Sequence, residues 1–489
     1  MTAVARITAI DRFIKGCKED GIYDDLNACC VMAGWASLAG ALTPLKGDAP
    51  TNNGFLAADF DRGIGLKGNG SSKYLDSNRA NNADGQDNHH SSVFVSSPTV
   101  SGGPGFDRYL GVYETALTPS TATNFYQTSD GSYAGSSRNN VTPIQGTATG
   151  VGIAGISRSS PSSFVMRIAG STHASGSVPS YTPSALDVFV FCGNLNGSPW
   201  RHTNARFAFY SIGSATDLAL LDARVSTLMA DLRAIEETGF DRDAIAYIRA
   251  VEEADGAYLE TSVKVAINNL VSGLKAESLW DAIGSSCLLC GPRTLAGALV
   301  PLRGDAPTAY GFVDGDYDRE GLTGDGTSYL DSNRANDAAP QNDFHFSAYQ
   351  AAPPTSTMTI AGATKSTATA VYTNIVLSGT GAYIRANNDT SALAAISGGQ
   401  SVGLFAATRS SSSEYYAKTG STSPSLVSTA SAPPSSLNLF VFANNADGVA
   451  GFIYNGTLAF YSIGTDIAAG LSKLDSHVSD YVTAIGAAL

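Results

Sequence analysis

The chain has 489 residues, of which 43% are hydrophobic and only 15% are charged, and its net charge is −13. This length allows two or three ordinary domains, and the hydrophobic fraction excludes a disordered chain. Lys and Arg residues are scattered singly, whereas phosphate neutralisation needs clustered cations, so we expect no nucleic-acid partner.

Two stretches bear on membrane targeting. The first ten residues contain one Arg and no long apolar run, so we expect no signal peptide. The most apolar later stretch, residues 287–302, is interrupted by Gly291, Pro292 and Arg293 and is too short to span a bilayer. We therefore expect no membrane insertion.

The chain opens with a helical pattern. Apolar residues recur every three or four positions and predict one buried face, formed by Val4, Ile7, Ile10, Phe13, Ile14 and Cys17. A similar helix is predicted at residues 263–274, and an additional one around residues 241–259 precedes it. The additional helix has no counterpart near the N-terminus, so we expect it to bridge two domains.

The middle of each half changes to short apolar runs between Gly, Ser, Pro and Asn clusters, which predict many short strands. Examples are residues 92–95, 108–113, 151–156 and 186–191. Each half closes with an amphipathic helix, and Asp217 and Asp466 stand at the expected N-caps. The apolar spacing of these helices favours packing against a sheet, with an oligomer seam as the alternative.

Self-similarity organises the whole chain. The stretch from Tyr74 to Asn81 recurs without change from Tyr329 to Asn336, and other blocks recur in the same order. These blocks begin at Leu38 and Leu295, Gly47 and Gly304, Asp59 and Asp316, Phe189 and Phe440, and Ala208 and Ala459. The offset drifts only from 257 to 251 residues. The sequence therefore predicts a tandem duplication of one complete domain.

These patterns predict a mainly β fold with two tandem jelly-roll sandwiches and helical segments at the N- and C-terminal ends of each copy. We expect a helical docking segment at residues 1–51 and a jelly-roll domain with its closing helix at 52–235. A bridging helical segment at 236–308 and a second jelly-roll domain with its closing helix at 309–489 follow.

The six cysteines include a pair with the spacing of half a zinc site, Cys287 and Cys290. The matching positions of the first copy hold Cys30 and Ala33, so that copy does without the pair. We expect buried, reduced cysteines, because free Cys commonly behaves as a small core residue.

Histidines and clustered aspartates are the other candidate metal ligands. The pair His89–His90 is matched by Phe344–His345, which favours strand-edge histidines over ligands or a catalytic base. Asp314, Asp316 and Asp318 could offer oxygens to calcium, but the first aspartate aligns with Ala57. An Asx-rich turn partnered by an arginine, Arg62 or Arg319, is favoured. We predict no metal and no cofactor.

One long polar block is identical in the two copies and supplies the candidate contact residues. These are Asp76, Asn78 and Arg79 in the first copy and Asp331, Asn333 and Arg334 in the second. Hydrogen-bonding side chains at the rim of a sandwich are suited to contact with a glycan or a protein. They are equally suited to bracing their own loop, because Asn, Asp and Ser cap turns well. Bracing is the favoured interpretation, and the contact role stays open.

Two segments resemble the early strand pair of laminin-G-like, concanavalin-A-like jelly rolls: Gly65 to Leu75 and Gly321 to Leu330. More specifically, nearly the whole chain resembles a module of structural proteins of tailed bacteriophages, many of them aquatic. The residues that carry this resemblance are Ala39 to Leu45, Tyr74 to Arg79, Ala208 to Gly213 and Leu221 to Val225.

The resemblance implies two concanavalin-A-like sandwiches in a virion component, made in the host cytoplasm and displayed as a tail fibre, an appendage or capsid decoration. Other capsid or tail proteins and further copies of the chain are the implied partners. The alternative is a lectin-like adhesion protein that binds a host-surface glycan.

The same superfamily includes glycoside hydrolases, which use two carboxylates about 5 Å apart. In that group the carboxylates come from a Glu-x-Asp-x-Glu pattern on one strand. Between Asn52 and Gly213 the sole glutamate is Glu114, and Glu414 of the second copy aligns with Ser163. We therefore predict no catalytic residues, and a hydrolase is the third and least favoured function.

Overall fold

The computed structural model describes residues 3–99, 106–139, 143–148, 150–175, 177–366, 370–379, 381–389, 396–420 and 422–489. The chain divides into two compact units. Unit 1 contains Met1–Gly239 and Gly256–Thr261, and unit 2 contains Phe240–Asp255 and Ser262–Leu489.

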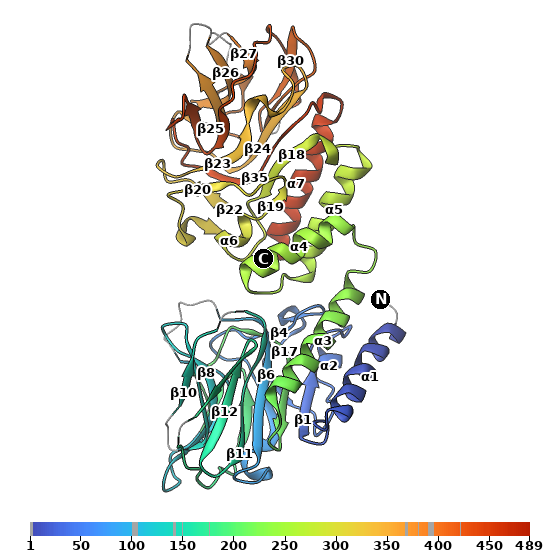
Figure 1. The fold of residues 1–489 in the computed structure, drawn as a ribbon, viewed down its shortest axis with the longest axis vertical. Helices are drawn as coiled ribbons and strands as arrows, with labels where there is room; N and C mark the ends of the chain where they lie inside the picture. The colour runs from blue at the N-terminus through green and yellow to red at the C-terminus, as the bar shows by residue number, and fades with distance from the viewer. Residues whose placement is uncertain are drawn as a thin grey trace. The chain divides into compact units, whose positions relative to one another are not determined.

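Unit 1 is built on two mostly antiparallel sheets (Figure 1). Sheet A has the strand order β13 (Ser171–Ala174), β12 (Ser163–Ile168), β11 (Gly152–Ser160), β6 (His89–Ser97), β17 (Arg206–Gly213), β4 (Gly65–Lys67) and β3 (Phe60–Asp61), and β1 (Leu26–Val31) also pairs with β17. Sheet B has the order β10 (Ile144–Gly146), β9 (Tyr133–Asn139), β8 (Thr121–Gln127), β7 (Asp107–Glu114), β14 (Asp187–Val190), β5 (Tyr74–Ala80) and β2 (Thr51–Asn53), with β15 (Gly193–Leu195) and β16 (Ser198–Trp200) beside β7.

Each face of sheet A covers a core. Between the sheets, Val93 and Phe207 of sheet A meet Leu110 and Phe125 of sheet B. The opposite face of sheet A packs against α1 (Ala3–Glu19) and α3 (Leu218–Glu236), which lie side by side in Figure 1. The short helix α2 (Leu38–Ala41) follows β1. Unit 1 therefore has three layers, with sheet A in the middle.

Unit 2 also contains two sheets. Sheet C has the order β19 (Pro301–Arg303), β18 (Ile283–Leu288), β35 (Thr457–Gly464), β24 (Phe344–Ala352), β29 (Gly403–Arg409), β30 (Glu414–Lys418) and β31 (Ser425–Ser428), and β22 (Gly321–Thr323) pairs with β35 and with β21 (Tyr317–Asp318). Sheet D has the order β20 (Thr308–Tyr310), β23 (Tyr329–Ala335), β32 (Asn438–Val441), β25 (Met358–Lys365), β26 (Val371–Ser378), β27 (Gly381–Asn388) and β28 (Ile396–Ser397), with β33 (Asn444–Ala446) and β34 (Val449–Gly451) beside β25.

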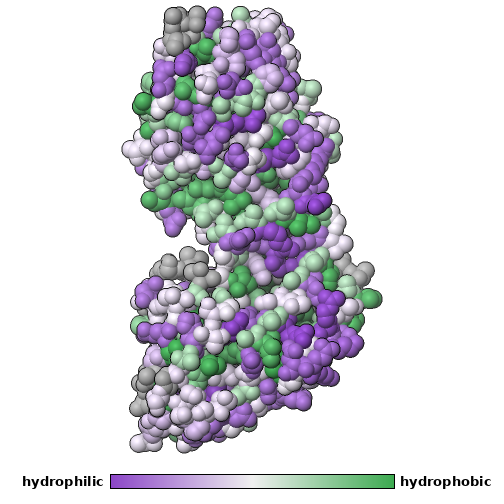
Figure 2. All heavy atoms as spheres, viewed as in Figure 1, coloured by the Kyte–Doolittle hydropathy of each residue, from purple (hydrophilic) through white to green (hydrophobic). Residues whose placement is uncertain are grey.

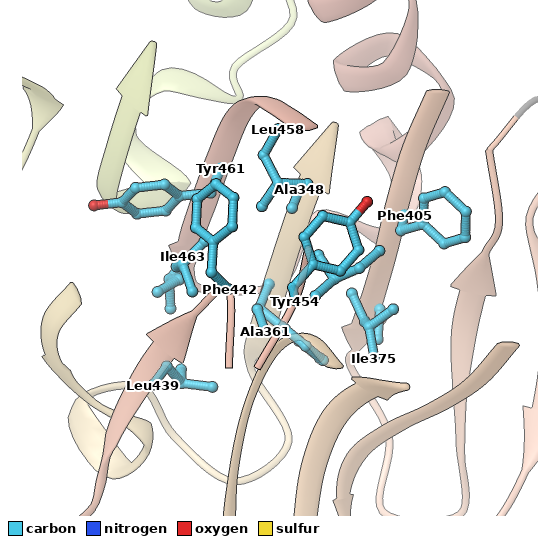
Figure 3. Close-up of a cluster of buried hydrophobic side chains, with 14 of the residues drawn as sticks. Ala348, Ala361, Ile375, Phe405, Leu439, Phe442, Tyr454, Leu458, Tyr461 and Ile463 are labelled. Carbon is cyan, nitrogen blue, oxygen red and sulfur yellow. The ribbon is translucent and has the colours of Figure 1, made fainter. Parts of the chain in front are cut away.

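The core of unit 2 lies between these sheets. Figure 3 shows members from both, among them Ala361 and Ile375 of sheet D and Ala348 and Phe405 of sheet C. The helices of unit 2 are α4 (Arg242–Asp255), α5 (Thr261–Ala276), α6 (Leu295–Ala298) and α7 (Leu471–Ala488). A mainly β fold of sandwiched sheets is thus confirmed, as is the buried apolar face predicted for residues 263–274.

Two predicted helical segments contain strands. Segment 1–51 includes β1, which pairs with β17, and segment 236–308 includes β18, which pairs with β35. Both strands are short and mostly buried. A buried strand of six residues has no exposed face, so its sequence shows no alternation and is easily taken for part of a helix.

Two details of the helix predictions are wrong. On α1, Phe13 and Cys17 are buried, but Val4 is 71% and Ile7 is 65% exposed, so only the second half of the helix uses its apolar face. Asp217 caps α3 as predicted, accepting from Ala219 N at 2.8 Å. Asp466 Oδ1 accepts from Ala468 N at 3.0 Å, at the start of a 3-10 turn (Ala468–Gly470), whereas α7 itself begins at Leu471 with Gly470 at its N-cap.

The drawn face of each unit shows little segregation of polar from apolar residues (Figure 2). Figure 2 shows hydrophilic, intermediate and hydrophobic residues interspersed over the drawn face of each unit. None of the helices within the described ranges is long and apolar enough to cross a bilayer.

The contrast between the two halves of α1 gives a matched pair of substitutions. Phe13 packs edge-on against Phe209 with ring centroids 5.9 Å apart, so Phe13→Ala should lower the free energy of unfolding by about 3–5 kcal/mol. Ile7→Ala removes an exposed side chain and should change it by less than about 0.5 kcal/mol. Urea denaturation of both variants measures the difference, and equal losses would contradict it.

Candidate functional site

The identical polar block forms one strand in each unit, β5 in unit 1 and β23 in unit 2. Asn78 and Asn333 both have a φ of 52°, in the left-handed region that Asn tolerates better than most residues. Asp76 Oδ1 accepts from Asn78 N at 2.9 Å, and Asp331 Oδ1 accepts from Asn333 N at 2.8 Å. Each strand thus contains the same Asx turn.

The two asparagine side chains reach toward the neighbouring edge strand. Asn78 Nδ2 donates to Ala49 O at 2.8 Å, and Asn333 Nδ2 donates to Ala306 O at the same distance. The same amides also donate to threonine hydroxyls: Asn78 Nδ2 to Thr51 Oγ1 at 3.1 Å, and Asn333 Nδ2 to Thr308 Oγ1 at 3.0 Å. These bonds hold β2 against β5 and β20 against β23, so the asparagines brace the fold. Their role as contact residues for a glycan or a protein stays a prediction.

The two arginines of the block have different surroundings. Arg79 pairs with Asp84, at 3.1 Å from Nε and 2.5 Å from Nη2. The position matching Asp84 is Ala339 in unit 2, and the Arg334 guanidinium lies over Gly284, where an added Cβ would be 2.5 Å from Cζ. Among the described residues, Arg334 Nε is buried without a hydrogen-bond partner, and burial lowers the pKa of this arginine.

Substitutions at Asp84 and at the matching Ala339 test this difference between the surroundings of the two arginines. Asp84→Ala would leave Arg79 without its carboxylate and should lower the free energy of unfolding by about 2 kcal/mol, the range of hydrogen bonds to charged groups. Ala339→Asp in unit 2 should have the opposite sign, because it supplies Arg334 with a partner. Denaturant titration of both variants measures the two effects. Destabilisation by Ala339→Asp would show that the Arg334 pocket does not accommodate a carboxylate.

The shared histidine is buried in the middle of a sheet. His90 on β6 and His345 on β24 are fully buried, and each of these strands is paired on both sides. The prediction of strand-edge histidines is therefore wrong. A polar residue at a sheet edge and one in a central strand look alike in sequence, because the pairing partners come from distant segments.

Each histidine closes a small buried network. His90 Nε2 lies 3.0 Å from Ser211 Oγ, which lies 2.9 Å from Ser92 Oγ. In unit 2, His345 Nε2 lies 3.1 Å from Ser462 Oγ. Burial lowers the pKa of both histidines to about 4, so both are neutral at pH 7.

A neutral buried histidine makes stability depend on pH. The pKa of His345 in the folded chain is about 4, below the ordinary value of 6.5. Its contribution to the free energy of unfolding is therefore complete above pH 6.5 and is lost as the pH falls toward 4, because the unfolded chain takes up the proton first. Within this window, His345 should contribute a slope of about 1.4 kcal/mol per pH unit. Urea denaturation between pH 4.5 and 7.5 should show a shallower dependence for His345→Gln than for the unsubstituted chain. Parallel curves would disprove this contribution.

The cysteines are buried thiols, as predicted. Burial raises the pKa of Cys287 and Cys290 to about 12, and that of Cys30 to about 11. Cys30 lies 3.5 Å from the hydroxyl of Tyr210, and Cys287 lies 3.4 Å from the matching Tyr461. In the part of the chain that the structure describes, no group of three or more His, Cys, Asp or Glu side chains is placed to hold a metal ion.

The aspartate clusters form turns, as predicted. Asp59 Oδ2 accepts from Leu56 N at 2.7 Å, and Asp316 Oδ2 accepts from Val313 N at 2.8 Å. The cation that pairs with Asp59 is Lys73, at 2.6 Å, in place of the predicted arginine. Arg62 instead lies 3.8 Å from Glu236.

A hollow of about 300 Å³ on the outer face of sheet B was not predicted, and we call it the Trp200 hollow. Its lining includes Arg108 of β7, Asn124 and Tyr126 of β8, Trp200 of β16, and the adjacent residues Phe106 and Arg201. The sequence signal for it was the spacing of Asn124 and Tyr126, which lie two residues apart on β8 and so share one face of the sheet. No sequence spacing links β8 to Trp200, so the cluster becomes visible only when the strands are paired.

No family model and no curated protein matches the chain. Among solved structures, the NanB sialidase of Streptococcus pneumoniae matches at 11% identity and a TM-score of 0.23, covering 33% of this chain and 27% of that one. Domains LG4-5 of the mouse laminin alpha1 chain match at 7% identity and a TM-score of 0.23, covering 79% and 85%.

Tailspike protein 2 of an Escherichia coli O157:H7 bacteriophage matches at 12% identity and a TM-score of 0.24, covering 39% of this chain and 26% of that one. The chain therefore spans about a quarter of the length of the sialidase and of the tailspike protein. Likenesses of this size carry no argument about function.

Proposed function

We propose that the chain is a non-enzymatic structural protein of a bacteriophage particle, displayed on the exterior as a tail fibre, an appendage or capsid decoration. It acts by protein–protein assembly with capsid or tail proteins and with further copies of itself. The sequence blocks that resemble phage structural modules, such as Tyr74 to Arg79 and Ala208 to Gly213, motivate this proposal.

The strongest support comes from the structural roles of the residues that both units share. Asn78 and Asn333 brace edge strands, and His90 and His345 close buried networks. The common block from Ala208 to Gly213 lies in a strand that is buried throughout. The framework of the fold has thus been kept in both units, as expected for a protein whose task is to present a rigid body.

Electron microscopy of the parent particle, with this protein labelled, tests the assembly role. We expect the label on purified particles, in many copies on the head for decoration or in a few copies on the tail for a fibre. A labelled protein of known position in the same particle provides the control. Particles that are complete yet lack the label would contradict the proposal.

The second candidate function is lectin-like adhesion to a host-surface carbohydrate. The Trp200 hollow favours it, because aromatic rings beside polar side chains are a common means of holding an amphipathic ligand. A tail fibre could combine both functions. Neither candidate includes cleavage of a saccharide.

A further inference from the structure

The Trp200 hollow brings two guanidinium groups onto aromatic rings. Arg108 Cζ lies 3.6 Å from the ring centroid of Tyr126 and 4.8 Å from that of Trp200. Arg201 Cζ also lies 4.8 Å from the Trp200 ring, and it lies 4.9 Å from that of Phe106. Stacking of this kind fixes the plane of a guanidinium.

Two buried polar side chains in the hollow have atoms without a hydrogen-bond partner among the described residues. Arg108 is 8% exposed, and its Nε and Nη1 have no hydrogen-bond partner among the described residues, although its side chain hydrogen-bonds to Tyr126. Asn124 is 4% exposed, and its Oδ1 has none either. Buried polar groups are nearly always paired in folded proteins, so these atoms point to a missing partner.

The charge of the hollow favours an anion. Its described lining includes two arginines and no carboxylate. Burial lowers the pKa of Arg108 to about 10, which leaves it charged at neutral pH. Asp107 lies near Arg201 and offsets part of the positive charge of the hollow.

We propose that the Trp200 hollow binds a carboxylate-bearing sugar residue, such as a uronic or sialic acid. Arg108 receives the carboxylate, with the charge of Arg201 beside it. The exposed aromatic surface of Trp200 and Phe106 packs on the apolar face of the ring, and Asn124 bonds a hydroxyl. The volume is at the lower end for small-molecule sites and fits a terminal residue better than a long chain. This inference rests on the second candidate function and names its ligand.

Unit 2 keeps the asparagine, as Asn374, but lacks the two arginines, Tyr126 and Trp200, so one ligand per chain is expected. Strand register matches Arg108 with Thr359 and Tyr126 with Val376. It matches Trp200 with Gly451, so the residue at the position of Arg201 is Phe452. Phe452 is 68% exposed and offers a matched control on unit 2.

Calorimetric titration of the full chain tests the proposal with oligosaccharides ending in glucuronic or sialic acid, each paired with its carboxyl-reduced form. We expect one site per chain and binding at least tenfold weaker for the reduced form. Arg108→Met and Trp200→Ala should each weaken binding at least tenfold, whereas Phe452→Ala should leave it unchanged. A change of tryptophan fluorescence on titration of the unsubstituted chain, to which Trp35 and Trp280 also contribute, gives a readout that does not depend on how the variants fold.

The outcomes separate this inference from the function on which it rests. Equal binding of acidic and reduced sugars, or unchanged binding by Arg108→Met, would overturn the acidic ligand but leave lectin-like adhesion standing. Binding of neither form, together with no binding on an array of neutral glycans, would remove both. Thermal unfolding confirms that each variant compared is folded.

Discussion

Each unit depends on one strand that is buried on both faces. In unit 1 this strand is β17, whose residues are all buried. Phe207 and Tyr210 enter the core between the sheets, whereas Phe209 packs against the helices. With both faces covered, the strand is apolar without alternation from Phe207 to Tyr210. At its end, a Cβ on Gly213 would lie 1.9 Å from Asp25 O, so only glycine fits. The recurrence of this block in β35 therefore has a packing cause.

A strand buried on both sides also leaves the buried polar side chains of the surrounding sheets to find partners inside the protein. The fully buried Arg158 of sheet A donates from Nε to Ser137 O of sheet B at 2.9 Å. In unit 2, Arg409 of sheet C donates in the same way to Ala386 O of sheet D at 2.8 Å. These guanidinium groups tie the two sheets of each unit together. They need no carboxylate, because backbone carbonyls accept the hydrogen bonds.

Periodicity in the sequence predicted the elements with one face on the core and one in water, such as α3. It failed where that condition does not hold. The strands β1 and β18 have no exposed face, and Val4 and Ile7 are apolar without a covering surface. The identical polar block was recognised as constrained, but the partner of its arginine depends on a residue five positions away. The Trp200 hollow combines strands that no local spacing connects.

Comparison of the two units identifies residues of the shared framework. It does not identify the residues of a site that is present in one unit only. It argues against the Cys pair and the His pair as metal sites, because the other unit lacks each pair. The same test would remove Arg108 and Trp200, which are matched by Thr359 and Gly451 in unit 2. Among the residues that agree between the units, Asn78 and Asn333 brace edge strands, and His90 and His345 close buried networks. A ligand site needs to exist in one unit only, so its specific residues can differ between the units. Such residues lie on the outer faces of the sheets, where a substitution disturbs the fold least.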